Sequence, residues 1–156
     1  MPMTRPARDV AVLAEPDIRR LVPLDLEALA AVEHAFARLA EGRADVPPIV
    51  GLFVPERQGE VDVKGAYIHG LPRMAIKIAS GFYGNPARGL PSGSGMMVVV
   101  SAETGFPEAV LLDNGYLTEI RTGLAGAAAA RYLAPSTVST VGVIGAGSQG
   151  RYQVRA

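Results

Sequence analysis

The sequence predicts an α/β fold in two parts: an α+β domain that takes up most of the chain, followed by the first elements of a doubly wound domain. Three observations lead to this fold class. A helical pattern covers residues 25–41, short apolar runs separated by turn residues fill 49–112, and an apolar segment at 139–144 runs into a glycine-rich turn.

The first predicted element is an amphipathic helix over residues 25–41. Asp25 is a suitable N-cap because its carboxylate can accept hydrogen bonds from the amides of the first turn. Gly42 stands just past the end, where a glycine commonly terminates a helix. The apolar side chains that recur at helical spacing are Leu29, Val32, Phe36 and Leu39.

Five strands are predicted between Ile49 and Asp113, because apolar runs there are punctuated by Gly, Pro and Asn. Glu103-Thr104-Gly105 links the last two, and a glycine in so short a link supplies the positive φ of a hairpin turn. These two strands are expected to be antiparallel neighbours. The predicted strands are 49–54, 61–69, 74–80, 96–101 and 107–112.

A second helix is predicted over residues 117–132, and its middle is rich in small side chains. Gly123 and Gly126 each cost the helix about 1 kcal/mol relative to alanine. Close packing against another element would explain both glycines. A plain alanine-rich helix is the alternative that this segment leaves open.

Composition narrows the class of protein. The 156 residues suffice for one domain, and 49% apolar against 19% charged residues favours a folded chain. The 15 basic residues balance 15 acidic ones, so we expect no nucleic-acid or membrane partner. The lack of cysteine excludes thiol chemistry, and no metal site is predicted. With no signal segment and no apolar run of about 18 residues, a cytoplasmic protein is expected.

The strongest chemical motif follows Pro135. Residues 139–144 predict a buried strand, after which the first glycine of a G-x-G-x-x-G turn permits a tight bend and the second lets the backbone approach a pyrophosphate. The third allows close helix–strand packing, and the amides of the following helix bind the phosphates. The motif therefore predicts a Rossmann domain that binds NAD or NADP. Its residues are Gly145, Ala146, Gly147, Ser148, Gln149 and Gly150.

The acidic residue that would separate NAD from NADP is expected about 20 residues beyond these glycines. The chain ends at Ala156, and it holds one strand and the start of one helix where a doubly wound sheet needs several such units. We therefore expect a truncated cofactor domain that does not bind NAD or NADP measurably by itself. Residues 141–144 are expected to lack parallel neighbours and to be mobile or paired with another chain.

Strand alternation gives Lys77 a distinctive neighbourhood. It shares its side of the predicted strand with Ala75 and Ala79, which leave room above the ammonium. Such a lysine could hold a substrate carboxylate or move a proton. A solvated lysine on an exposed sheet face is the alternative.

Two further segments are candidate parts of a site. Residues 81–95 predict a long loop with hydroxyls at Ser92 and Ser94, and both a functional loop and a plain surface connection stay open. Arg121 begins the small-residue helix, and its guanidinium could bind a carboxylate or phosphate through two parallel hydrogen bonds. Taken alone, a surface ion pair is the simpler interpretation of Arg121.

Together these segments resemble the ornithine cyclodeaminase and mu-crystallin family, from about Leu24 to Gln153. Residues 62–67 and 112–116 look most like the subgroup of ectoine utilisation proteins. The motifs that carry the family resemblance are 76–86, 89–91, 116–122, 130–135 and the glycine turn at 145–150.

The resemblance implies a bilobal protein, with residues 1–120 as a substrate-binding and dimerisation domain and residues 121–156 as the linker helix, first strand and glycine loop of a Rossmann domain. It implies that Lys77 and Arg121 bind the carboxylate of a small amino or imino acid, that Lys77 is catalytic, and that the chain forms a homodimer through its N-terminal sheet. The implied cofactor-binding residues are Ser92, Arg121, Thr122, Gly145, Ala146, Gly147, Ser148 and Gln149.

The activity that the resemblance implies is NAD(P)-dependent cyclodeamination or imine reduction by a full-length parent, in ectoine or related amino-acid catabolism. A non-catalytic binding or structural protein like mu-crystallin, or an inactive fragment, is the alternative. Two departures bear on the site. Family members usually carry an arginine after the Pro-Pro segment, whereas here the segment runs on to Gly51, and the catalytic aspartate of the cyclodeaminase branch would lie beyond residue 156.

Overall fold

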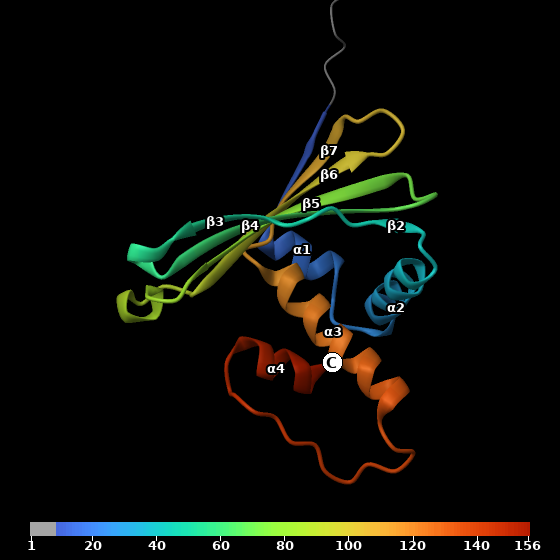
Figure 1. Ribbon diagram of the computed structural model, residues 1–156, viewed down its shortest axis with the longest axis vertical. Helices are drawn as coiled ribbons and strands as arrows, with labels where there is room; N and C mark the ends of the chain where they lie inside the picture. The colour runs from blue at the N-terminus through green and yellow to red at the C-terminus, as the bar shows by residue number, and fades with distance from the viewer. Residues whose placement is uncertain (1–8) are drawn as a thin grey trace, which may run out of the picture.

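The computed structural model describes residues 9–156, in which a twisted sheet carries four helices on one side (Figure 1). Strands β4 to β7 form an antiparallel meander, β1 adds in parallel to β7, and β2 and β3 both pair with β4, so that the order is β1-β7-β6-β5-β4-β2. The strands are β1 (Ala11–Ala14), β2 (Ala44–Asp45), β3 (Val50–Val54), β4 (Gly59–Ile68), β5 (Arg73–Phe82), β6 (Gly93–Ser101) and β7 (Pro107–Leu112).

The five predicted strands are confirmed as β3 to β7, and the predicted β6–β7 hairpin is present, with φ +71° at Gly105. The predicted loop 81–95 is shorter than expected, because β5 runs on to Phe82 and β6 already begins at Gly93. A 3-10 turn, η2 (Asn85–Arg88), closes this hairpin. A second such turn, η1 (Pro55–Arg57), joins β3 to β4.

The sequence pattern missed β1 and helix α1 (Glu15–Leu21). Four residues are too few to display an alternation, and β1 is defined instead by its parallel pairing with β7. Pro16 resembles a helix breaker, yet it lies in the first turn of α1, where its missing N–H has no intrahelical partner to lose.

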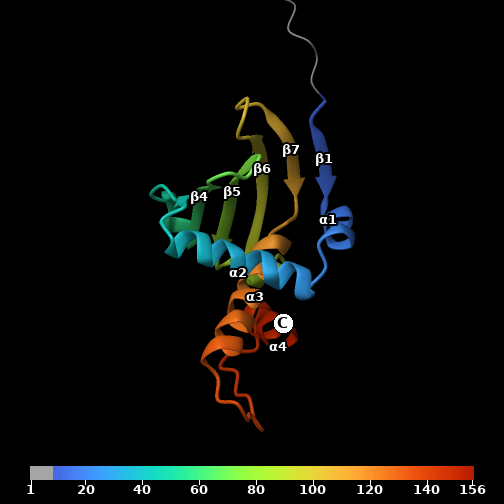
Figure 2. The ribbon, with the colours of Figure 1, turned by 90° about the vertical axis from the view of Figure 1, so that its right-hand side faces the viewer.

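The predicted helices are confirmed as α2 (Leu26–Ala40) and α3 (Tyr116–Leu133). Asp25 caps α2 as expected, since its carboxylate accepts a 2.9 Å hydrogen bond from the amide of Ala28. Figure 2 shows α2 lying across the sheet on the side that α3 also covers. Two small buried clusters join these elements: Ile18, Tyr116 and Ile120, and Leu29, Leu124 and Ala128.

The small-residue stretch of α3 is explained by helix α4 (Ser148–Arg155), which packs against it. A Cβ atom on Gly123 would lie 2.9 Å from the carbonyl oxygen of Tyr152, and one on Gly126 would overlap the side chain of Gln153. Close packing, rather than a plain alanine-rich helix, is therefore the reason for both glycines.

The buried strand that the pattern predicts over residues 139–144 is not formed, in agreement with the expectation that this segment lacks parallel neighbours. No residue between Leu133 and Ser148 belongs to a strand, and Val141 and Ile144 are 76% and 106% exposed. A strand needs a neighbour to take up its amide and carbonyl groups, and this segment has none beside it. Its apolar residues therefore stand in an extended, unpaired connection between α3 and α4.

Register divides the residues of the sheet between two faces. Leu13 and Leu111 pack against the buried residues of α1 and α3, and the cross-strand register places Met97 and Lys77 on the same side as Leu111. We call this side the helix face. The opposite side, the open face, carries Val12, Val50, Leu52, Val63, Ile76, Ile78, Met96, Val98, Val110 and Leu112.

Candidate functional site

Lys77 lies at the middle of β5 on the helix face, under the first turn of α3. Its side chain is half-buried, and its ammonium donates a long hydrogen bond of 3.4 Å to the hydroxyl of Thr118. Ala75 and Ala79 flank it on the same face, as alternation predicted. The structure therefore favours a half-buried Lys77 over a solvated surface lysine, because the first turn of α3 contacts its ammonium.

Burial lowers the pKa of Lys77 below its usual range, and the positive charges of Arg121 and Lys64 lower it further. The carboxylates of Asp62 and Asp113 act in the opposite direction. A lysine in such surroundings exchanges its proton more readily than a solvated one, and proton transfer or carboxylate binding are the two chemistries open to it.

Arg121 stands one turn beyond Thr118 on α3, and it is exposed. Among residues 9–156 no carboxylate forms an ion pair with its guanidinium, so the surface ion pair considered for it is absent. The arginine lines one end of an apolar hollow between α2 and β4, together with Val32, Phe36, Ala66 and Ile68. Lys77 and Arg121 thus place two cations without a paired anion near the start of α3.

The start of α3 is fixed by the segment Asp113-Asn114-Gly115. Asn114 and Gly115 both have left-handed backbones, with φ of +52° and +87°. Asp113 is 1% exposed, and its Oδ2 accepts a 2.8 Å hydrogen bond from the amide of Leu117. This carboxylate therefore anchors the turn of helix that carries Thr118 over Lys77.

The glycine loop is attached to the same helix. The side-chain amide of Gln149 donates a 2.7 Å hydrogen bond to Glu119, and the amide of Gln153 donates to the carbonyl of Thr122 at 3.0 Å. Gly145 has a φ of +98°, so it takes the left-handed bend that the motif requires of its first glycine. A Cβ on Gly150 would collide with the carbonyl of Gly145, so the third glycine permits close approach within the loop.

Several predicted cofactor-binding residues stand apart from this arrangement. Ser92 is exposed just before β6, and its carbonyl accepts a 2.7 Å hydrogen bond from the amide of Phe82. The hydroxyl of Thr122 donates to the carbonyl of Thr118 at 2.7 Å and is occupied within α3. Ala146 and Ser148 are exposed in the loop. The structure thus places Thr122 and Gln149 at the contact between α3 and α4, whereas Arg121 lines the hollow between α2 and β4 and Ser92 contacts none of these residues.

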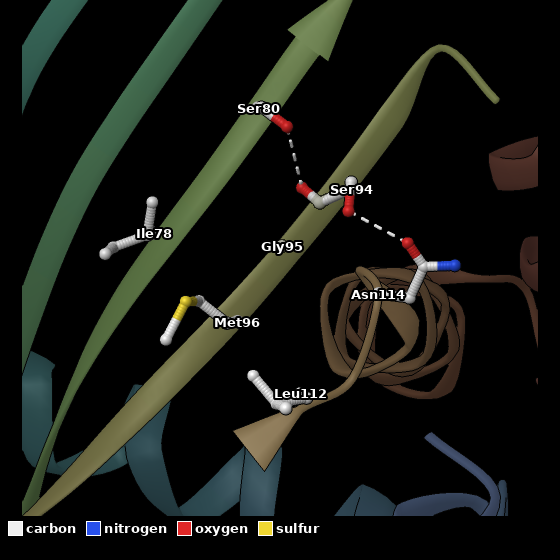
Figure 3. Close-up of a pocket in the computed structure, with 7 residues that line it drawn as sticks. All are labelled: Ile78, Ser80, Ser94, Gly95, Met96, Leu112 and Asn114. Atoms are coloured by element: carbon white, nitrogen blue, oxygen red, sulfur yellow. Dashed lines mark hydrogen bonds between the residues drawn. The ribbon is translucent and has the colours of Figure 1, made fainter. Parts of the chain in front are cut away.

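A separate hollow lies on the open face, at the end of β5 and the start of β6 (Figure 3). Ile78, Met96 and Leu112 form its floor, and the hydroxyl of Ser94 donates a 2.8 Å hydrogen bond to Asn114 at its rim. Its lining has no titratable side chain. The side chains of this hollow can therefore hydrogen-bond a ligand, but none of them can act as an acid or a base.

Sequence reasoning missed Lys64 and Asp62 as neighbours of Lys77. Lys64 is the cross-strand partner of Lys77, and its ammonium lies 2.7 Å from the carboxylate of Asp62. The turn at Gly70, with φ +88°, sets this register. A count outward from that turn would have found the pair. In the described part of the chain no three His, Cys, Asp or Glu side chains gather as for a metal ion, and no helix has the length and hydropathy of a membrane span.

The chain is 53% identical over 146 residues to an uncharacterized cyclodeaminase of Sinorhizobium fredii, and the match covers 93% of this chain and 44% of the relative. The chain therefore spans less than half the length of that relative.

Two solved structures have the same fold. An archaeal alanine dehydrogenase dimer with bound NAD superposes with a TM-score of 0.84 at 37% identity, over 94% of this chain and 44% of that one. The Thermococcus litoralis Δ1-pyrroline-2-carboxylate reductase, in complex with NADH and L-proline, gives a TM-score of 0.87 at 31% identity, over 94% and 45%. The family model of the ornithine cyclodeaminase/mu-crystallin family matches residues 8–156, and the chain belongs to this family.

Proposed function

We propose that this chain is the substrate-binding part of an NAD(P)-dependent enzyme that acts on a small amino or imino acid, by cyclodeamination or imine reduction. The observation that carries the proposal is the position of Lys77 and Arg121, two cations near the first turns of α3 that form no ion pair with a described carboxylate. A substrate carboxylate bridging them would supply the missing negative charge. Lys77, whose pKa is lowered by burial, then gives or takes a proton beside the carbon that reacts.

The glycine loop suits a dinucleotide. Helix α4 begins after Gly147 with no side chain capping its first amides, and a Cβ on Gly145 or Gly147 would meet nothing within 4 Å. Open space above uncapped amides is what a pyrophosphate requires. Gly145, Ala146, Gly147, Ser148 and Gln149 would hold it, with Arg121, Thr122 and Ser92 as further proposed contacts. The bound nicotinamide would supply hydride transfer. The relatives named above that carry NAD or NADH support this assignment.

The proposal is tested in a chain long enough to carry a complete cofactor domain. Lys77→Met is expected to lower kcat/KM for NADH-dependent reduction of a cyclic imino acid by at least about 100-fold, because a positioned acid or base is worth about that much. The control is Arg73→Met on the same strand, because the Arg73 side chain is 61% exposed and is paired with Glu108. Wild-type turnover in the Lys77 variant contradicts the proposal. Ligand binding without any turnover in the unmutated protein favours the mu-crystallin-like alternative.

We also propose that two copies associate through the open face. Its strands carry exposed apolar side chains, with Val12 62%, Leu52 60% and Leu112 45% exposed, while the helices cover only the other side. A contiguous apolar surface of this kind marks an interaction site. The archaeal alanine dehydrogenase of the same fold is a dimer, which supports the assignment.

The domain boundary after residue 120, the ectoine utilisation subgroup and the cytoplasmic location stay predictions.

A further inference from the structure

The apolar stripe of α2 extends beyond the side chains that cover it. Leu29, near the start of the helix, is 4% exposed and packs against Leu124 and Ala128 of α3. Phe36 and Leu39 belong to the same stripe, yet they are 53% and 50% exposed. The second half of α2 faces β4 across a hollow of about 390 Å³. This hollow is therefore an apolar space that the described chain leaves unfilled.

The floor of the hollow continues the part of β4 that lies beside Lys77. Ala66 and Ile68 follow Lys64 at alternate positions of β4, so all three lie on the helix face. Lys64 is opposite Lys77 in the register of β4 and β5, and Ala66 is opposite Ala75. Both alanines are exposed. The floor of the hollow therefore begins two residues, or about 7 Å, along the sheet from Lys77.

The hollow has apolar walls and one charged group. Among the described residues that line it, Arg121 alone has a polar side chain, and its guanidinium forms no ion pair with a described carboxylate. A ligand with an anionic end and an apolar end would match both features. A second polar group on the ligand would lose its hydration against these walls without gaining a hydrogen bond.

We propose that this hollow binds the side chain of the substrate, and that the substrate is an amino or imino acid with one carboxylate and a long apolar side chain. This rests on the proposed function, in which Lys77 and Arg121 bind the carboxylate. The side chain then extends along β4 toward Ile68 and lies under Phe36. It needs roughly five carbon–carbon bonds to cover the distance from Lys77 to Ala66.

Monocarboxylates of matched length test the hollow in the chain of residues 1–156. Hexanoate and δ-aminovalerate have chains of equal length, which end in a methyl group and an ammonium group. Hexanoate is expected to bind roughly 10-fold more tightly than acetate, because each buried methylene adds about 4-fold and only part of the chain is covered. By contrast, δ-aminovalerate is expected to bind no more tightly than acetate, because its ammonium would lose hydration in the hollow.

NMR signals of isoleucine methyl groups show where hexanoate binds. In protein labelled with ¹³C at these methyl groups, hexanoate is expected to shift the signal of Ile68, which Ile68→Val assigns. Ile76 and Ile78 lie on the open face, so their signals control for binding to that apolar surface. The ε-carbon signal of Lys77 is expected to shift with both acetate and hexanoate, since each carries a carboxylate.

Variants of α2 separate the hollow from the rest of the helix. Ala35→Leu fills the hollow and is expected to bring the affinities for hexanoate and acetate together. The matched control is Ala37→Leu, because Ala37 is exposed on α2 and does not line the hollow. Phe36→Ala removes one wall without crowding the fold, and it is expected to weaken hexanoate binding roughly 5-fold.

Two results would overturn the assignment of the hollow while the carboxylate site stands: an Ile68 signal that hexanoate leaves unshifted, or equal affinities for hexanoate and δ-aminovalerate. A lower mass of Phe36→Ala than of the unmutated chain in light scattering would also overturn it, because the hollow would then be an interface between copies. The proposed function fails separately, if Arg121→Gln leaves the affinity for acetate unchanged.

Discussion

The two faces of the sheet are built from alternate residues of the same strands, yet they differ in almost every property. The helix face carries Asp62, Lys64 and Lys77 among small alanines, and helices cover it. The open face is apolar from β3 to β1, and Ile76, the neighbour of Lys77, points to it. Because alternate side chains of β4 and β5 point to opposite faces, the same two strands carry the candidate site on one face and the proposed dimer surface on the other.

The strongest way to break this division is to place a charge on the open face. Ile76→Glu is expected to convert a dimer into a monomer, with an association constant lowered at least about 100-fold, because an unpaired carboxylate would be buried between apolar faces. Sedimentation or light scattering at micromolar concentration measures the mass. Leu133→Glu is the control, since Leu133 is 82% exposed at the end of α3, away from the sheet. A monomeric unmutated chain contradicts the proposed association.

The close approach of β5 and β6 beside the start of α3 is tested by adding one methyl group. Gly95→Ala is expected to lower the free energy of unfolding by about 2 kcal/mol, because its Cβ would lie 2.9 Å from the carbonyl oxygen of Ile78 and 3.7 Å from Cα of Gly115. Gly93→Ala on the same strand is the control, since its Cβ would make an ordinary 3.7 Å contact with the carbonyl of Ser80. Urea denaturation compares the two variants, and equal stabilities would show that β6 can move away from the carbonyl oxygen of Ile78 at no cost.

The smallest expected effect is the contribution of Lys77, on the helix face, to the pH dependence of stability. The pKa of Lys77 is lowered in the folded chain, so the unfolded chain binds more protons in the pH range below the ordinary lysine value of 10.5. Stability contributed by this group therefore rises as pH rises through that range. Lys77→Met is expected to raise Tm at pH 7 by a few degrees or less, with the difference from the unmutated chain shrinking as pH approaches 10.5. A difference that does not change with pH would assign the effect to packing.

Local patterns were enough to predict five strands and two helices, since each has its own periodicity and turn residues. They failed at residues 139–144, where an apolar run and a following glycine motif predicted a strand that has no neighbour to pair with. A strand forms only where a second segment pairs with its amide and carbonyl groups, and the sequence of one segment does not show whether such a partner is present. The same reasoning explains β1, which exists through its pairing with β7.

The candidate site was predictable in part for a related reason. Lys77 was identified from the alanines beside it on its own strand, and Arg121 from its place at the start of a helix. Lys64 and Asp62 were missed because their relation to Lys77 depends on the register between β4 and β5. The half-burial of Lys77 could not be predicted because sequence alternation cannot say which face a helix covers.

Thr118 and Glu119 are adjacent residues of α3, and they face two different sites. Thr118 accepts a hydrogen bond from Lys77, and Glu119 accepts one from Gln149 of the glycine loop. A ligand that draws Gln149 away from Glu119 therefore acts on the turn of helix that covers Lys77. If binding at the glycine loop changes the affinity at Lys77, thermodynamic linkage requires an anion at Lys77 to change the affinity at the loop by the same factor. One turn of α3 thus contacts both sites.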